Sequence, residues 1–121
     1  MKHQKLSDSV FEPREGYERA VLFTESDFGS GTKVQLMRLN PGQTIPAHHH
    51  NYRTECFRIV SGRGEISING SVAATSPDDL VLCQPGDVHE FRNLSDTEAL
   101  TFLVIRTNDK GNEDMIWEDK Q

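Results

Sequence analysis

Turn-forming residues interrupt this chain at short intervals and leave little room for long regular elements. Clusters of Gly, Pro, Asn, Asp or Ser stand at residues 29–31, 40–42, 62–64, 69–70, 77–79, 85–87 and 93–96. Between them lie short stretches with alternating or β-branched side chains, at residues 34–39, 57–60, 65–68 and 100–105. No window of a dozen residues keeps a helical period. This spacing of turns predicts an all-β sandwich or barrel.

The most specific local signal is the dipeptide Asn69-Gly70. Both central positions of a type I′ turn require a positive φ, which asparagine and glycine tolerate. We therefore expect a tight hairpin flanked by Ile68 and Ser71. The charged, turn-rich ends of the chain, residues 1–15 and 108–121, are predicted to form irregular N- and C-terminal arms. Trp117 suggests that the C-terminal arm docks on the rest of the fold.

Size and charge narrow the classes of function. A chain of 121 residues is expected to form one domain, residues 1–121. The 19 acidic and 13 basic residues give a net charge of -6, which argues against nucleic acid and membrane surfaces as partners. No membrane-spanning stretch or N-terminal secretory signal is visible in the sequence. We therefore expect a cytoplasmic protein in which Cys56 and Cys83 are packing thiols.

Three of the five histidines are consecutive: His48, His49 and His50. Taken alone, this run is as well explained by a polar loop or a chance cluster. In a β-strand, however, successive side chains point to opposite faces, so His48 and His50 would share one face and His49 would occupy the other. Two imidazoles on one face are close enough to converge on one ion.

Glu55 and His89 are the candidates that would complete such a site. Glu55 follows His50 by five residues, which would place it on the opposite face of an unbroken strand. A turn or bulge at residues 51–54 is therefore required, after which Glu55, Phe57 and Ile59 would share the inward face of the next strand. His89 follows the turn at residues 85–87 and starts another short β stretch.

Three imidazoles and one carboxylate suit a divalent zinc, manganese, iron, nickel, cobalt or copper ion. Calcium and magnesium prefer oxygen ligands and fit this set poorly. Four protein ligands in an octahedral field leave two positions open, whereas a structural zinc site is normally a closed tetrahedron. The set therefore favours a catalytic or ligand-exchanging metal site over a structural one.

At these residues the sequence resembles the cupin family. The first cupin motif is matched at every signature position, and the second is matched at three positions, with Gln84 in place of its proline and Asp78 in place of its leading glycine. The resemblance spans about residues 34–105 and implies a jelly-roll-like double-stranded β-helix, usually assembled as a homodimer. The matched positions are Gly42, His48, His50, Glu55 and Gly62 in the first motif and Gly86, His89 and Asn93 in the second. The metal ligands that the resemblance implies are His48, His50, Glu55 and His89.

Cupins perform many reactions, so membership alone does not name one. We expect a metal-dependent isomerase or dioxygenase acting on a small oxygenated metabolite, or a non-catalytic module that binds or senses a small-molecule ligand. Tyr52 and Arg53 lie between the histidines and Glu55. They are interpreted here as ordinary loop side chains, with a proton donor (Tyr52) and an anion clamp (Arg53) as the functional alternative.

Overall fold

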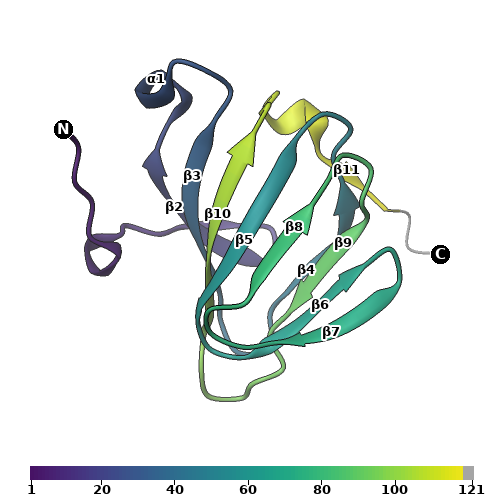
Figure 1. Cartoon of the computed structure of the whole chain (residues 1–121). Helices are drawn as coiled ribbons and strands as arrows, with labels where there is room; N and C mark the ends of the chain where they lie inside the picture. Colours follow the sequence, from purple (N-terminus) through teal and green to yellow (C-terminus); the bar gives the residue numbers. More distant parts are fainter. Residues whose placement is uncertain (119–121) are drawn as a thin grey trace.

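The computed structural model describes residues 1–118 and shows two antiparallel sheets that face each other as the walls of a barrel (Figure 1). One sheet has the strand order β1-β2-β3-β10-β5-β8, and the other has the order β11-β4-β9-β6-β7. The all-β, double-stranded β-helix prediction is confirmed. Among residues 1–118, no helix has the length and apolar character needed to span a membrane.

The strands of the first sheet are β1 (Glu12–Arg14), β2 (Tyr17–Phe23), β3 (Lys33–Leu39), β10 (Leu100–Thr107), β5 (Thr54–Ser61) and β8 (Leu80–Cys83). Those of the second are β11 (Ile116–Trp117), β4 (Thr44–His49), β9 (His89–Arg92), β6 (Gly64–Ile68) and β7 (Ser71–Thr75). One helical turn, α1 (Glu25–Phe28), and two 3-10 turns, η1 (Leu6–Asp8) and η2 (Asn112–Asp114), lie outside the sheets.

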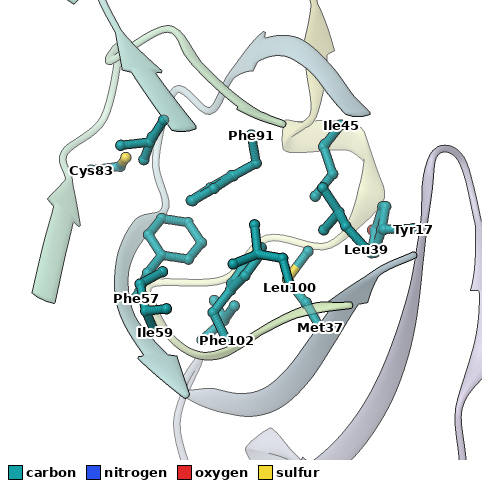
Figure 2. Packing of buried hydrophobic residues seen from close by; sticks show 12 residues of the cluster. Tyr17, Met37, Leu39, Ile45, Phe57, Ile59, Cys83, Phe91, Leu100 and Phe102 are labelled. Atoms are coloured by element: carbon teal, nitrogen blue, oxygen red, sulfur yellow. The ribbon is translucent and has the colours of Figure 1, made fainter. Parts of the chain in front are cut away.

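The core fills the space between the sheets with the alternate, inward side chains of each strand. The rings of Phe57, Phe91 and Phe102 contact one another, with centroids 4.5–5.7 Å apart, and the aliphatic side chains pack around them (Figure 2). Burial of each such side chain stabilises the fold by about 1.5–3 kcal/mol. The apolar strands therefore form a core that positions the polar residues at one end of the barrel.

Two turns carry the backbone conformations that their sequences require. Asn69 and Gly70 have φ of 51° and 86° and join β6 to β7, with Ile68 opposite Ser71, so the predicted hairpin is confirmed. Gly62 has a φ of 82°, and a Cβ at this position would lie 2.2 Å from the carbonyl oxygen of Ala99. The last glycine of the first cupin motif is therefore required by both conformation and space.

The two ends of the chain are more ordered than the predicted irregular arms. β1 and β2 extend the six-stranded sheet beyond residues 34–105, and β11 adds an edge strand beside β4. Trp117 lies opposite His48 in this pairing, so the described part of the C-terminal arm docks on the barrel as predicted. Residues 119–121, which complete the predicted arm, lie outside the described residues.

The outer face of the six-stranded sheet is only partly covered. On the β2 and β3 side, Ala20, Leu22 and Leu36 form a second buried apolar cluster, against which Phe11 packs. On the β10, β5 and β8 side, Leu80, Leu82 and Ile105 are 71%, 54% and 40% exposed. An apolar surface thus remains open over β8 and the neighbouring strands.

Candidate metal centre

Four polar side chains converge at one end of the barrel interior. They are His48 on β4, His50 directly after it, Glu55 on β5 and His89 at the start of β9. All four are buried, and their candidate ligand atoms lie within 4.8 Å of one another. The structure therefore brings together the four residues singled out in the sequence, although they span 42 positions of the chain.

The three imidazoles are oriented by the backbone. Nδ1 of His48 lies 2.8 Å from the carbonyl oxygen of Pro46, that of His50 2.8 Å from Asp114 and that of His89 2.9 Å from Asp87. A carbonyl oxygen only accepts hydrogen bonds, so each Nδ1 carries the proton. In the neutral ring, Nε2 then presents its lone pair to the centre of the site, as in metal sites whose ligands are held by outer hydrogen bonds.

His49 points away from this centre. Its Nδ1 contacts the carboxylate of Glu118, while His48 and His50 are 5% and 3% exposed on the opposite side. The strand alternation predicted for the triple histidine is therefore confirmed. The turn at residues 51–54 also directs the following side chains inward as expected, because Glu55, Phe57 and Ile59 are all buried on the inner face of β5.

Glu55 lies between imidazoles on one side and arginines on the other. Its Oε1 is 3.1 Å from Nε2 of His50 and 3.3 Å from Nε2 of His89. Its Oε2 accepts a hydrogen bond from Nε of Arg106 at 2.9 Å. Burial raises the pKa of Glu55, but its close contacts with His50 and His89 and the charge of Arg106 outweigh burial and hold the pKa well below its usual range. Glu55 is therefore an anion at neutral pH.

Burial and the charge of His89 lower the pKa of His48 to about 4, so His48 is neutral at pH 7. Burial also lowers the pKa of His89, but contacts with the thiol of Cys83 and with Glu55 outweigh it and raise the pKa to about 10. A metal ion that binds Nε2 of His89 must therefore displace a proton.

The C-terminal arm closes this end of the barrel. The carboxylate of Asp114 accepts hydrogen bonds from the backbone N–H groups of Asn51, Tyr52 and Arg53, at 2.7–3.1 Å for the shortest contact of each. Burial raises the pKa of Asp114, but these three hydrogen bonds outweigh it and lower the pKa below its ordinary value. Met115, the next residue, lines the cavity beside the histidines. The arm thus holds the loop that connects the histidines to Glu55.

The cavity among these side chains has a volume of about 10 Å³. This is room for an ion or for about one water molecule. Its lining combines the polar groups with apolar side chains, including those of Tyr17, Met37 and Ile45. An organic ligand must therefore displace a lining side chain to reach the centre.

Several features could not be read from the sequence. Arg53 is 2% exposed and directed into the site, which supports the functional alternative over the loop interpretation, whereas Tyr52 is 59% exposed in the loop. Arg106 was not singled out, because it lies at the end of an apolar strand whose register was unknown.

Cys83 lies opposite Glu55 and beside His89, while Cys56 is partly exposed on the outer face, and both are free thiols.

The donor set fits a divalent transition metal. Three nitrogens with fixed tautomers and one carboxylate oxygen surround a space of ionic size, and Nε2 of His89 is buried without a well-aligned hydrogen-bond partner among the described residues. A buried polar atom without a partner is costly, and coordination of an ion would satisfy it. The four residues could hold a metal ion.

Comparison with known proteins identifies the family. Residues 35–106 match the Cupin domain family, so the chain belongs to the cupins. It is 29% identical over 110 residues to a 5-nitrosalicylic acid 1,2-dioxygenase from Bradyrhizobium sp, covering 82% of this chain and 53% of that protein. It is also 29% identical over 69 residues to an oxalate-binding protein from Thermotoga maritima, covering 57% of this chain and 56% of that protein. The chain thus matches little more than half the length of either relative.

Solved structures support the same fold. The polyketide cyclase RemF from Streptomyces resistomycificus aligns over 100% of this chain and 87% of its own, with a TM-score of 0.83 and 18% sequence identity. At this identity the likeness concerns the fold alone.

Proposed function

We propose that this protein, as a single domain, binds one divalent transition metal through His48, His50, Glu55 and His89 and acts on a small oxygenated metabolite. The observation that carries the proposal is the set of three Nδ1 contacts to backbone carbonyls. These contacts direct the three Nε2 atoms toward Glu55 and toward one another. Zinc, manganese, iron, nickel, cobalt and copper all suit this donor set.

When bound, the ion would supply Lewis-acid or redox chemistry at positions that the protein leaves open. Residues of this chain orient the ligand atoms around these open positions. Arg106 holds Oε2 of Glu55, which leaves Oε1 directed toward the imidazoles. The apolar lining and the C-terminal arm limit the entry of water, so electrostatic interactions in the cavity are stronger than in solvent.

An enzyme of the dioxygenase or isomerase type is the first candidate for the activity, and the similarity to a named 1,2-dioxygenase over 82% of this chain supports it. The second candidate is a non-catalytic module that binds a small ligand through its metal, which the named oxalate-binding protein supports. The cavity favours neither, because its protein groups are those expected for ligand capture in both cases.

We also propose that two copies of the chain associate through the open outer face of β5, β8 and β10. Leu80 and Leu82 are more than half exposed there, beside Ile105. Large exposed apolar patches are characteristic of association surfaces. A twofold dimer would bury the same patch on both copies.

The decisive experiment is elemental analysis of protein purified without chelator or affinity metal, followed by oxygen uptake with a panel of diketones, flavonols and hydroxybenzoates. Iron or copper with oxygen uptake is expected of a dioxygenase. Zinc or manganese without uptake favours the isomerase or the binding module.

Thermal melting gives a second, independent measurement. An ion that binds only the folded chain stabilises it by about 2.7 kcal/mol at a free concentration one hundred times its Kd. Chelation should therefore lower the melting temperature by several degrees. Identical melting curves with and without metal, together with an elemental analysis that detects no transition metal, would rule the proposal out.

A further inference from the structure

The cavity at the metal centre is closed by buried side chains on nearly every side. Of the residues that line it, all but one are buried, and the exception is Met115 of the C-terminal arm, which is partly exposed. Within residues 1–118, Met115 is thus the lining side chain that reaches both the cavity and the solvent. A ligand that arrives from solvent therefore meets the Met115 side chain before it meets the histidines.

The backbone on either side of Met115 is held in place. Before it, the carbonyl oxygen of Asp114 accepts a hydrogen bond from Nδ1 of His50 at 2.8 Å. After it, β11 pairs with β4, and the N–H of Glu118 donates to the carbonyl oxygen of Ala47 at 2.9 Å. The arm thus runs from β10 of one sheet to an edge of the other, fastened at both ends of this segment (Figure 1). Access to the cavity therefore depends on movement of the Met115 side chain rather than of the arm.

The Met115 side chain is suited to such movement. Methionine is unbranched, has three rotatable side-chain bonds and adapts its shape to its surroundings. Partly exposed side chains also change rotamer far faster than backbone segments move. Met37 lines the same cavity, but it is 5% exposed and packs within the main apolar cluster. Of these two methionines, Met115 is the one that can rotate into solvent without disturbing the core.

The next residue, Ile116, faces the other way. Met115 has an extended backbone, with φ of −110° and ψ of 110°, so the two successive side chains point to opposite sides. Ile116 pairs with His49, which faces away from the metal centre, and it does not line the cavity. It is partly exposed, as Met115 is. Ile116 therefore provides a matched control for effects of the arm that do not involve the cavity.

We infer that the Met115 side chain is the gate of the metal cavity and the residue that limits the size of the ligand it admits. This inference rests on the proposed function and deepens it. With Met115 in place, the cavity volume is about 10 Å³. Outward rotation of the side chain adds the space that it vacates, so compact ligands enter readily and bulky ones are held back.

The first test uses the full chain loaded with cobalt(II), with imidazole and 4-phenylimidazole as probes. Both coordinate through the same type of ring nitrogen and differ in bulk. Their binding rates are followed by stopped-flow measurement of the visible absorption of cobalt, and cobalt content is measured for every variant. The variants are Met115→Ala, Met115→Phe and the control Ile116→Ala.

Wild type is expected to bind imidazole at least about tenfold faster than 4-phenylimidazole, because the larger probe needs a wider opening. Met115→Ala should accelerate both probes and 4-phenylimidazole more, so that the difference between their rates shrinks. Met115→Phe should slow both, since the ring is larger and stiffer than the methionine side chain. Ile116→Ala should behave as wild type.

The second test needs no metal. Diethyl pyrocarbonate modifies unprotonated imidazole nitrogens, and Nδ1 of His48 and of His50 is engaged by a backbone carbonyl, so the reagent must reach Nε2 inside the cavity. Modification in metal-free protein is measured by mass spectrometry relative to His3, which is exposed. Met115→Ala should raise the rates at His48 and His50 at least about tenfold, and Ile116→Ala should leave them unchanged.

Unchanged probe rates in cobalt-loaded Met115→Ala would overturn the inference and leave the proposed metal site intact. Equal acceleration in Met115→Ala and Ile116→Ala would also overturn it, because the arm as a whole would then be the moving part. If Met115→Ala does not fold, unchanged rates in Met115→Phe overturn it equally. If wild type takes up no cobalt, the proposed function fails, and the modification rates of His48 and His50 alone decide whether Met115 is the gate.

Discussion

Nδ1 of His50 donates a hydrogen bond to the backbone carbonyl of Asp114 across 64 residues of sequence, at a distance of 2.8 Å. The C-terminal arm therefore fixes the tautomer and the orientation of a candidate metal ligand. The carboxylate of Asp114 also accepts hydrogen bonds from the backbone N–H groups of the loop at Asn51–Arg53. One residue of the arm thus joins the metal centre to the segment that positions Glu55.

The Asp114→Asn variant should be less stable than wild type by about 1–3 kcal/mol at pH 7, because a neutral amide replaces a carboxylate that accepts three backbone N–H groups. The folded pKa of Asp114 lies below its ordinary value of 3.8. The stability that ionised Asp114 contributes is therefore complete above pH 3.8 and is lost as the pH falls through its folded pKa. Urea unfolding at pH 7 and near pH 3 should show the difference between variant and wild type shrinking in acid.

The exposed residue Asp96 provides the matched control for this series. Asp96→Asn is expected to unfold as wild type at both pH values. Equal stability of Asp114→Asn and wild type at pH 7 would show that the arm is not held by this carboxylate.

The triple histidine contains its own control. His48→Ala or His50→Ala should remove a metal ligand and reduce the metal content measured by elemental analysis, because both Nε2 atoms face the centre. His49→Ala should leave the metal content close to that of wild type, since His49 faces Glu118. Circular dichroism checks that each variant is folded. Loss of metal in His49→Ala with retention in His48→Ala would contradict the proposed ligand set.

Replacement of Arg106 by Met should make stability more dependent on metal. The variant leaves the buried carboxylate of Glu55 without its 2.9 Å hydrogen bond from Nε, and breaking such a pair costs about 3–5 kcal/mol. A metal ion bound at Glu55 would replace part of the positive charge that Arg106 supplies to this carboxylate. The melting temperature should therefore drop further on chelation in Arg106→Met than in wild type, with Arg63→Met, at an exposed position in the turn between β5 and β6, as the control. An equal drop in all three proteins would argue against this role for Arg106.

Light scattering at micromolar concentration should give the mass of a dimer. Leu82→Lys, which introduces a charge into the open outer face of the sheet, should shift the protein toward monomer without loss of metal, since Leu82 is 54% exposed and faces away from the cavity. Val72→Lys is a suitable control, because Val72 is similarly exposed on β7 of the other sheet. A monomer mass for wild type would remove the dimer proposal and leave the fold assignment unaffected.

The parts of the site that the sequence predicted depend on local rules. Strand alternation separates His49 from His48 and His50, and the positive φ required at Asn69-Gly70 places one hairpin. Glu55 follows His50 by an odd number of residues, which indicates a turn between them. These features depend on neighbouring residues, so a single sequence contains the information.

The parts that the sequence did not predict depend on long-range register and docking. Arg106 faces Glu55 because β10 and β5 pair in one register, with a shift between Thr101 and Phe102. Asp114 reaches the loop after β4 because β11 pairs with that strand. Neither alignment follows from local composition, so both residues resembled ordinary charged residues near the ends of elements.

The contact of Trp117 with His48 has a practical consequence. Trp117 is the chain's only tryptophan, and its ring centroid lies 5.2 Å from that of His48. A paramagnetic ion bound at the imidazole would quench the indole emission, whereas zinc would leave most of it. Fluorescence of the unlabelled protein therefore reports both occupancy of the centre and the electronic character of the ion.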